Sequence, residues 1–298
     1  MKIGAVYPQT EMETDPGAVT HYAQAVEEMG FDHILIYDHV IGAGPDTRPG
    51  ANLPYTINDP FHEPFVLMTY LAARTSKIGL MTGVLVITQR QAVLAAKQAA
   101  CVDVLSQGRL RLAVGTGWNT AEYQALGMDF STRGRRVEEQ IEVMRRLWTQ
   151  RSVTFLGEQH TLNDVGLLPM PVQQPIPLWI GGGNDRAKFG QPANLNVLRR
   201  VARIGDGWLQ QVTNPTRAAE LIEAFRGFCR EYGRDPDEVG IESMFNLTAA
   251  GQGSWAADMK VWAGLGVSHM ALVTLGDGLK GVDAHLKRLE AFRQAVPA

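Results

Sequence analysis

Short runs of apolar and β-branched residues alternate along this chain with longer segments whose apolar residues recur at helical spacing. The short runs predict strands over Lys2–Tyr7, His33–Asp38, Lys77–Val84, Leu110–Val114, Leu178–Ile180, Gly207–Gln210, Gly240–Leu247 and His269–Thr274. The longer segments predict helices over Pro16–Met29, Phe61–Arg74, Gln91–Leu105, Arg133–Thr149, Leu195–Arg203, Pro215–Tyr232, Trp255–Leu265 and Gly281–Ala295. A helix therefore follows each expected strand.

This alternation in a chain of 298 residues favours an α/β fold of the (β/α)8 TIM barrel type with insertions. Parallel strands need helical crossovers, and closure of the sheet removes its two free edges. A doubly wound open sheet is the alternative with the same alternation. We expect a single barrel domain over residues 1–298.

Two insertions interrupt the regular spacing. Residues 41–60 are rich in glycine and proline and are predicted to form a lid over the site. Residues 152–177 contain the β-like Val153-Thr-Phe155 and a proline-rich run, and we expect them to shape the rim. For each insertion the alternative is a surface excursion without chemistry.

The composition excludes several function classes. The chain is 45% hydrophobic and 20% charged, with 28 Lys and Arg against 31 Asp and Glu, and it has no long basic run. We therefore expect no nucleic-acid partner. No apolar stretch is long enough to span a bilayer, and the chain enters a strand at Lys2, which predicts a cytoplasmic protein without a membrane partner. The two cysteines support neither a disulfide framework nor a multi-cysteine metal site.

The segment Leu105–Asn119 carries the clearest local signal. A helix is predicted to end at Gly108, a short apolar strand follows, and Gly115 and Gly117 then allow close approach of the backbone to a ligand. In a barrel the active site lies at the carboxyl ends of the strands. The residues at these ends are Tyr7-Pro-Gln9, Asp38-His39, Gly83-Val84, Gly115–Trp118, Gly181–Gly183, Gln210-Gln211 and Asn246. They are poor in metal ligands, so we expect no metal and regard a metal-dependent hydrolase as a weak alternative.

Several motifs resemble one known family. They are Asp38-His-Val40, Leu71-Ala-Ala-Arg-Thr75, Leu105–Asn119, Leu126-Gly127, Arg133-Gly134, Pro177-Leu-Trp-Ile-Gly-Gly182 and Gly205-Asp-Gly-Trp208. In order and spacing, from Met1 to about Pro215, they are similar to the luciferase-like monooxygenase family, and most of all to its branch of oxidoreductases that use the deazaflavin coenzyme F420. The resemblance implies a bacterial-luciferase-like barrel with insertions, a flavin-type ring at the strand ends and a homodimer.

The same resemblance suggests which residues bind the cofactor. The candidates are Asp38, Gly83, Val84, Gly115, Thr116, Gly117, Trp118, Gly181, Gly182, Gly183 and Gln211. Glycine N–H groups at the strand ends could hold a phosphate, although tight strand-to-loop turning explains the same glycines. The usual barrel phosphate site follows the last two strands, so the phosphate position stays open. A non-proline cis peptide at Gly83–Val84 is also implied, with an ordinary trans strand end as the alternative.

His39 is the candidate catalytic residue, because the resemblance places it near the carbon that gives or receives hydride. A near-neutral imidazole could exchange a proton with the substrate, whereas an ordinary hydrogen-bonded histidine is the competing interpretation. Trp118 forms either a wall of the pocket or a plug over the barrel. Sugar-phosphate dehydrogenases of the family carry an acid at this position, which makes glucose 6-phosphate an unsuitable substrate. Arg133 and Arg135 are candidates for contact with the phosphate or acidic tail, or are solvated helix charges.

We thus expect an oxidoreductase that transfers hydride between F420 and a small organic substrate. The first alternative is an FMN-dependent two-component monooxygenase, which receives reduced flavin from a partner reductase and activates O2. A cofactor-binding barrel without turnover is the second. The expected partners are a small organic substrate, a second copy of the chain and a flavin or F420 reductase.

Overall fold

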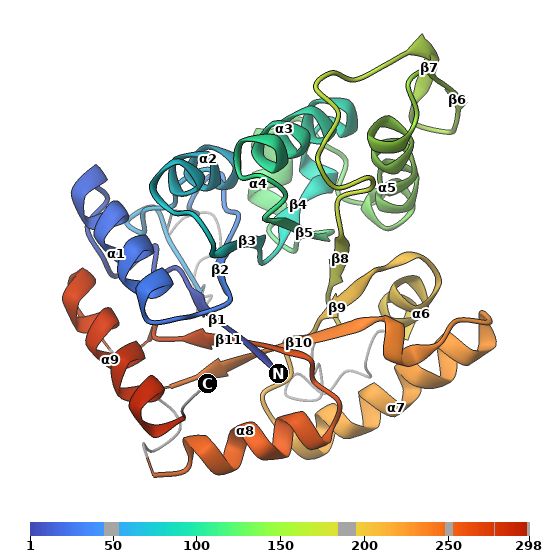
Figure 1. Ribbon diagram of the computed structural model, residues 1–298. Helices are drawn as coiled ribbons and strands as arrows, with labels where there is room; N and C mark the ends of the chain where they lie inside the picture. Colours follow the sequence, from blue (N-terminus) through green and yellow to red (C-terminus); the bar gives the residue numbers. More distant parts are fainter. Residues whose placement is uncertain (45–53, 184–194, 248–252, 277, 297–298) are drawn as a thin grey trace.

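The main sheet of the protein closes into a barrel in the computed structural model, which describes residues 1–44, 54–183, 195–247, 253–276 and 278–296 (Figure 1). Its strands are β1 (Lys2–Val6), β2 (His33–Ile36), β3 (Gly79–Thr82), β4 (Leu85–Val86), β5 (Leu110–Gly115), β8 (Leu178–Gly181), β9 (Gly207–Leu209), β10 (Gly240–Asn246) and β11 (His269–Val273). The ring runs β1-β2-β3-β5-β8-β9-β10-β11 and returns to β1, with parallel pairing throughout. The open sheet is therefore excluded, and the predicted barrel is confirmed.

Helices surround the ring of strands (Figure 1). They are α1 (Pro16–Glu28), α2 (Pro64–Arg74), α3 (Ala92–Leu105), α4 (Thr120–Ala125), α5 (Arg133–Thr149), α6 (Leu195–Ile204), α7 (Pro215–Glu231), α8 (Trp255–Gly264) and α9 (Val282–Ala295). Asp15 caps α1 by accepting hydrogen bonds from two backbone amides, and Pro16 occupies the first turn, where no donor is needed. The predicted helices and strands agree with these bounds to within a few residues.

The predicted strand Lys77–Val84 is divided in the structure. β3 ends at Thr82, a cis peptide bond joins Gly83 to Val84, and β4 continues beside β5. The implied cis bond is thus present. A 3-10 turn over Ile87–Gln89 then leads into α3, and a second one covers Pro236–Glu238.

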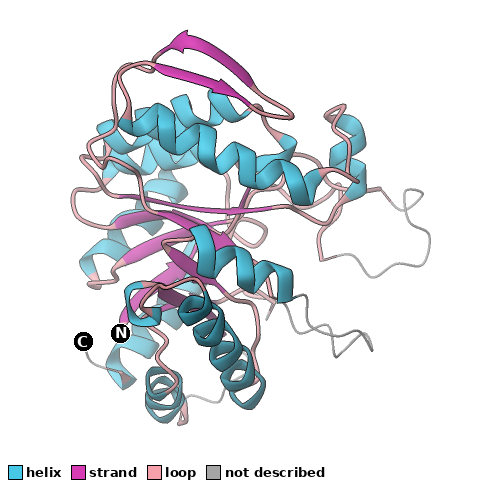
Figure 2. Cartoon of the chain, turned by 90° about the vertical axis from the view of Figure 1, so that its right-hand side faces the viewer, coloured by secondary structure: helices cyan, strands magenta, loops and turns pink. Residues whose placement is uncertain are grey.

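The second insertion contains a hairpin outside the barrel. Its strands, β6 (Val153–Leu156) and β7 (Thr161–Val165), pair antiparallel and stand beyond α5 (Figure 2). Glu139 of α5 holds the turn by accepting hydrogen bonds from the amides of Glu158 and Gln159 and from His160. The first insertion, predicted as a lid over 41–60, lies in part outside the described residues.

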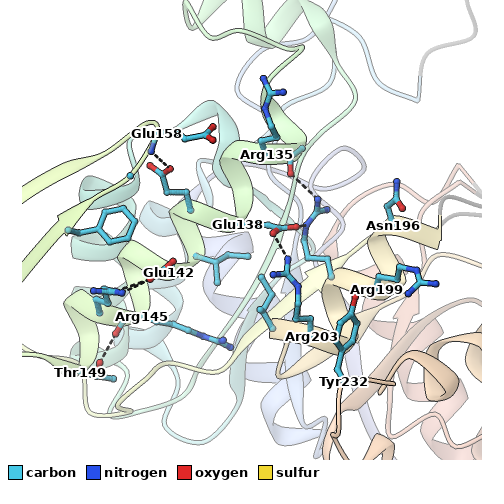
Figure 3. A pocket seen from close by; sticks show the side chains of 18 residues that line it. Arg135, Glu138, Glu142, Arg145, Thr149, Glu158, Asn196, Arg199, Arg203 and Tyr232 are labelled. Atoms are coloured by element: carbon cyan, nitrogen blue, oxygen red, sulfur yellow. Dashed lines mark hydrogen bonds and ion pairs between the residues drawn. The ribbon is translucent and has the colours of Figure 1, made fainter. Parts of the chain in front are cut away.

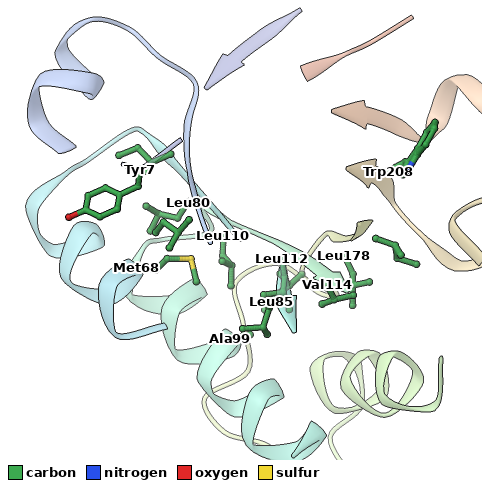
Figure 4. Packing of buried hydrophobic residues seen from close by; sticks show 14 of the residues in the cluster. Tyr7, Met68, Leu80, Leu85, Ala99, Leu110, Leu112, Val114, Leu178 and Trp208 are labelled. Atoms are coloured by element: carbon green, nitrogen blue, oxygen red, sulfur yellow. The ribbon is translucent and has the colours of Figure 1, made fainter. Parts of the chain in front are cut away.

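Two apolar layers build the fold. One lies between the outer faces of the strands and the helices, where Leu80, Leu110 and Leu112 face Met68 and Ala99 (Figure 4). The other fills the inside of the barrel with Val6, Leu35, Met81, Ala113, Trp179, Leu209 and Ala271. The strands are buried on both faces, which explains their nearly continuous apolar runs. None of the described helices is long and apolar enough to cross a membrane.

Candidate active site

A cavity of about 670 Å³ opens at the carboxyl ends of the barrel strands. This volume lies within the usual range for ligand pockets. Of the predicted site residues, Asp38, His39, Gly83, Val84, Gly117, Trp118 and Gln211 line it. Gly115, Thr116 and Gly181–Gly183 are not among its described lining residues. The structure thus brings together the strand ends of β2, β3 and β5, as the sequence predicted.

A buried carboxylate holds the candidate catalytic histidine. Glu122 lies in the first turn of α4, is 1% exposed, and its Oε1 lies 3.2 Å from His39 Nδ1. The same oxygen accepts hydrogen bonds from the Val40 amide at 3.1 Å and the Tyr55 hydroxyl at 3.0 Å. Gln89 Nε2 donates to the other oxygen at 3.0 Å. The contacts of Glu122 therefore fix the position of the imidazole.

The electrostatics of Glu122 determine the histidine tautomer. Burial would raise the pKa of Glu122, but hydrogen bonds from His39, Gln89 and Tyr55 outweigh burial and lower this pKa from its ordinary value. A carboxylate only accepts hydrogen bonds, so His39 Nδ1 carries the hydrogen. Nε2 is then the ring nitrogen available for proton exchange with a ligand.

Aromatic rings gather around His39. Its ring centroid lies 3.8 Å from that of Tyr55, 4.9 Å from Phe61 and 6.4 Å from Trp118. Tyr55 is also fixed by Asn119, whose Nδ2 donates to the tyrosine hydroxyl at 2.7 Å while its Oδ1 caps α4. Trp118 is 42% exposed although it lines the cavity, so it forms a wall of the pocket and does not fill the barrel.

Asp38 is committed to neighbouring protein groups. Its Oδ1 accepts from Arg90 NH2 at 2.7 Å, and its Oδ2 accepts from the Val86 amide at 2.8 Å. Arg90 also binds Glu63 at 2.9 Å. Burial would lower the pKa of Arg90, but Asp38 and Glu63 outweigh it and raise this pKa. Asp38 therefore holds the backbone that follows Val84.

Packing explains the glycines at the strand ends. A Cβ atom on Gly115 or Gly181 would lie 2.6 or 2.3 Å from a methyl group of Val84, and one on Gly117 would lie 2.6 Å from Val86. The Gly182 amide already donates to the Leu209 carbonyl at 3.2 Å. A Cβ atom on Gly183 would lie 3.1 Å from the Trp208 ring. Binding of a phosphate by these amides stays a prediction.

Other predicted contacts lie outside the cavity. The carbonyl of Thr116 accepts from the Tyr123 hydroxyl at 2.6 Å. The Arg133 guanidinium stacks 3.6 Å from the centroid of the Phe130 ring. Arg135 lies on an outer groove, and neither arginine is among the described residues that line the cavity. Within the described ranges no cluster of three or more His, Cys, Asp or Glu side chains could hold a metal ion.

The groove that contains Arg135 is larger, about 1160 Å³, but it runs along the outer surface between α5 and α6 (Figure 3). Several of its charged side chains pair with one another: Glu138 binds both Arg200 and Arg203, and Glu142 binds Arg146. Because the groove lies away from the strand ends and these charges are already paired, we assign the active site to the smaller cavity.

A family model described as luciferase-like monooxygenase matches residues 2–263 of the chain. The chain belongs to the luciferase-like monooxygenase family. It is 30% identical over 300 residues to an uncharacterized protein of Mycobacterium tuberculosis, covering 98% of this chain and 99% of the relative. It is 27% identical over 310 residues to an F420-dependent glucose-6-phosphate dehydrogenase of Segniliparus rotundus, covering 100% of this chain and 81% of the relative.

Solved structures share the fold over nearly the whole length of this chain. An F420-dependent secondary alcohol dehydrogenase in complex with an F420-acetone adduct matches with a TM-score of 0.79 and 18% identity, covering 100% of this chain and 99% of the other. The monooxygenase RslO1 from Streptomyces bottropensis matches with a TM-score of 0.78 and 20% identity, covering 99% and 98%. The protein is therefore an enzyme of a family whose cofactor is F420 or a flavin.

Several site residues were not predicted from the sequence. Glu122, Tyr55, Phe61 and Gln89 surround His39 but come from α4, the first insertion, the loop before α2 and the turn after β4. One local signal was present: Asn119 is a favourable N-cap three residues before Glu122, the spacing of a short helix start.

Proposed function

We propose that the protein is a deazaflavin-dependent oxidoreductase that transfers hydride between coenzyme F420 and a small organic substrate. The observation that carries this proposal is the pairing of His39 with buried Glu122 at the wall of a 670 Å³ cavity at the strand ends. The similarity of the whole of this chain to the F420-dependent enzyme from Segniliparus rotundus supports the choice of coenzyme.

The cavity suits a flavin-type ring. Gln9 is 2% exposed, and its Oε1 has no hydrogen-bond partner among the described residues, while its Nε2 donates to the Tyr37 carbonyl at 2.9 Å. An unsatisfied buried acceptor calls for a donor. The ring imide N–H of a deazaflavin or a flavin is such a donor. Val84 and Trp118 supply apolar surface for a planar ring.

The side chains of this chain then have separate roles. Bound F420 supplies a carbon that gives or accepts hydride. As an imidazolium, His39 would donate the Nε2 proton to the oxygen of a carbonyl substrate while its Nδ1–H stays bonded to Glu122. In the reverse direction the neutral imidazole would accept the alcohol proton at Nε2. Glu122 holds the imidazole, and Asp38 with Arg90 holds the strand end that contains Val86. Tyr55 and Phe61 shield part of the imidazole from water.

An FMN-dependent two-component monooxygenase is the second candidate. The family model favours it, because it is described as luciferase-like monooxygenase. Trp118 argues only against a sugar phosphate as substrate, since this position does not carry the acid of the sugar-phosphate dehydrogenases. The protein would then take reduced flavin from a reductase partner. In either case we expect a cytoplasmic homodimer.

Fluorescence titration of the purified protein with F420 and FMN, each oxidised and reduced, tests the proposal. We expect tight binding of F420 and weak binding of FMN. In the reduction of a carbonyl compound by reduced F420, His39→Ala should lower kcat by about a hundredfold and change the coenzyme Kd little, because general acid–base catalysis contributes on this scale. His21→Ala, at an exposed histidine of α1, is the control. Tight binding of FMN alone would replace the proposal by the second candidate, and binding of neither would refute both.

A further inference from the structure

The charges along the cavity wall are acidic. Glu11, Asp38 and Asp59 line it, and no lysine or arginine is among its described lining residues. The guanidinium of Arg90, which contacts the lining residue Asp38, is bound to Asp38 and Glu63. An anionic substrate would lose hydration here without gaining a cation, which is unfavourable.

Glu11 contributes an uncompensated charge to this wall. Its Oε1 accepts from the Gly276 amide at 2.9 Å, whereas its Oε2 has no hydrogen-bond partner among the described residues. His285 Nε2 lies 3.8 Å from Oε2, and burial lowers the pKa of His285. The histidine is therefore neutral near neutral pH, and it leaves the charge of Glu11 in place.

The remaining surface is aromatic and apolar on both sides. Trp118, Phe61 and Tyr55 form the side near β5. Met244 of β10 and Leu275, which follows β11, stand on the opposite side of the ring of strands, because β10 and β11 lie across the barrel from β3 and β5. A planar apolar molecule would contact both sides and displace water from them.

We propose that this cavity takes an uncharged, largely apolar carbonyl compound or the corresponding alcohol, and that it discriminates against carboxylates and phosphates. This inference rests on the proposed function for the carbonyl group, but not for the charge preference. Glu11 sets that preference through its negative charge, and Trp118 supplies the surface on which an aromatic or alicyclic substrate packs.

Two probes that differ in charge test the inference: methyl 4-acetylbenzoate and 4-acetylbenzoate. Their binding is measured by calorimetry, both to the free protein and to protein saturated with oxidised F420. We expect the ester to bind at least about tenfold more tightly than the acid, since a single nearby like charge at an intermediate dielectric costs this much. The free protein reports on the charge preference even if F420 does not bind, so failure of the inference and failure of the proposed function are distinguishable.

Variants assign the effect to residues. Glu11→Gln should reduce the ratio of ester to acid affinity several-fold, whereas Glu28→Gln, at an exposed carboxylate at the end of α1, should leave it unchanged. Trp118→Ala should weaken ester binding by about tenfold, and the 42% exposure of Trp118 makes this variant tolerable to the fold. Equal affinities, tighter binding of the acid, or binding of neither probe would overturn the inference. A ratio unchanged in Glu11→Gln would overturn the role of Glu11.

Discussion

The two ends of the barrel both contain a buried carboxylate that binds a histidine, but they use it differently. At the amino end Glu242 accepts from His33 Nε2 at 2.5 Å and from Arg111 at 2.9 Å. The Arg111 guanidinium stacks 4.5 Å from the centroid of the Trp179 ring, and His269 packs against the same ring at 5.0 Å. Side chains fill this end completely enough that a Cβ atom on Gly207 or Gly240 would collide with Trp179.

At the carboxyl end Glu122 also binds a histidine, His39, through Nδ1, but this histidine lies against a cavity of about 670 Å³. The rings of Tyr55 and Phe61 cover only part of the imidazole, whose side chain remains 19% exposed. The comparison teaches that a buried carboxylate bound to a histidine can either fill one end of the barrel or hold a catalytic group. The difference lies in whether the neighbouring space is filled by the protein or left for a ligand.

Breaking the ion pair at the amino end should have the largest effect. In Glu242→Gln the charge of Arg111 loses its buried partner and His33 loses a carboxylate acceptor, and we expect the free energy of unfolding to fall by about 3–5 kcal/mol. Urea denaturation measures this loss. The control is Glu142→Gln, which breaks an exposed ion pair with Arg146 on α5 and should cost less than about 1 kcal/mol. Equal losses of unfolding free energy in the two variants would show that the buried ion pair does not stabilise the amino end of the barrel.

The sequence predicted the architecture well because the barrel strands are buried on both faces and read as apolar runs. It also predicted Asp38 and His39 at the cavity, since the carboxyl ends of parallel strands meet at one end of a barrel. The glycines were harder to interpret. Gly115 and Gly181 indicate close approach of another group to the backbone. The structure shows that this group includes the side chain of Val84.

The contacts of His39 could not be predicted in the same way. Glu122 is separated from His39 by 83 positions, and α4 is a six-residue helix with too few turns to give a periodic pattern. The amino-end cluster was missed for a related reason. His33 and Glu242 lie inside runs that are otherwise apolar, and their pairing across 209 positions follows from closure of the barrel. The hairpin strand β7, with one buried residue, has no apolar alternation to predict it.

Breaking the corresponding pair at the carboxyl end should affect chemistry more than stability. In Glu122→Gln the amide replaces an oxygen that accepts from His39 Nδ1, so the tautomer is no longer fixed. We expect kcat to fall by about tenfold to a hundredfold with a smaller change in KM. The ¹⁵N shifts of the imidazole should report a mixture of tautomers. Glu139→Gln, which removes the partner of His160 at the hairpin, is the matched control and should leave kcat unchanged. Equal losses of kcat in both variants would contradict a positioning role for Glu122.

The smallest expected effect is the loss of stability at acid pH, which we expect to arise mainly at the amino end of the barrel. Burial, followed by the charge of Arg111, lowers the pKa of His269 at the amino end to about 3 from its ordinary value of 6.5. Between these values the unfolded chain binds a proton that the folded protein does not, so stability is lost as pH falls below 6.5. We expect a loss of about 1 kcal/mol between pH 7.5 and 5.5, measured by urea denaturation at each pH.

Glu242, whose pKa is lowered to about 2 because His33 and Arg111 outweigh its burial, adds to this loss of stability only below its ordinary pKa of 4.5. Glu122 has a lowered pKa as well, so the carboxyl-end carboxylate also contributes only in that lower range. His269→Asn should therefore flatten the loss between pH 7.5 and 5.5. His285 lies beside Glu11 at the carboxyl end, and burial lowers its pKa as well. If His285→Asn removes the part of the stability loss that remains in His269→Asn, that part arises at the carboxyl end. A profile unchanged by His269→Asn would mean that the amino end accepts the proton without loss of stability.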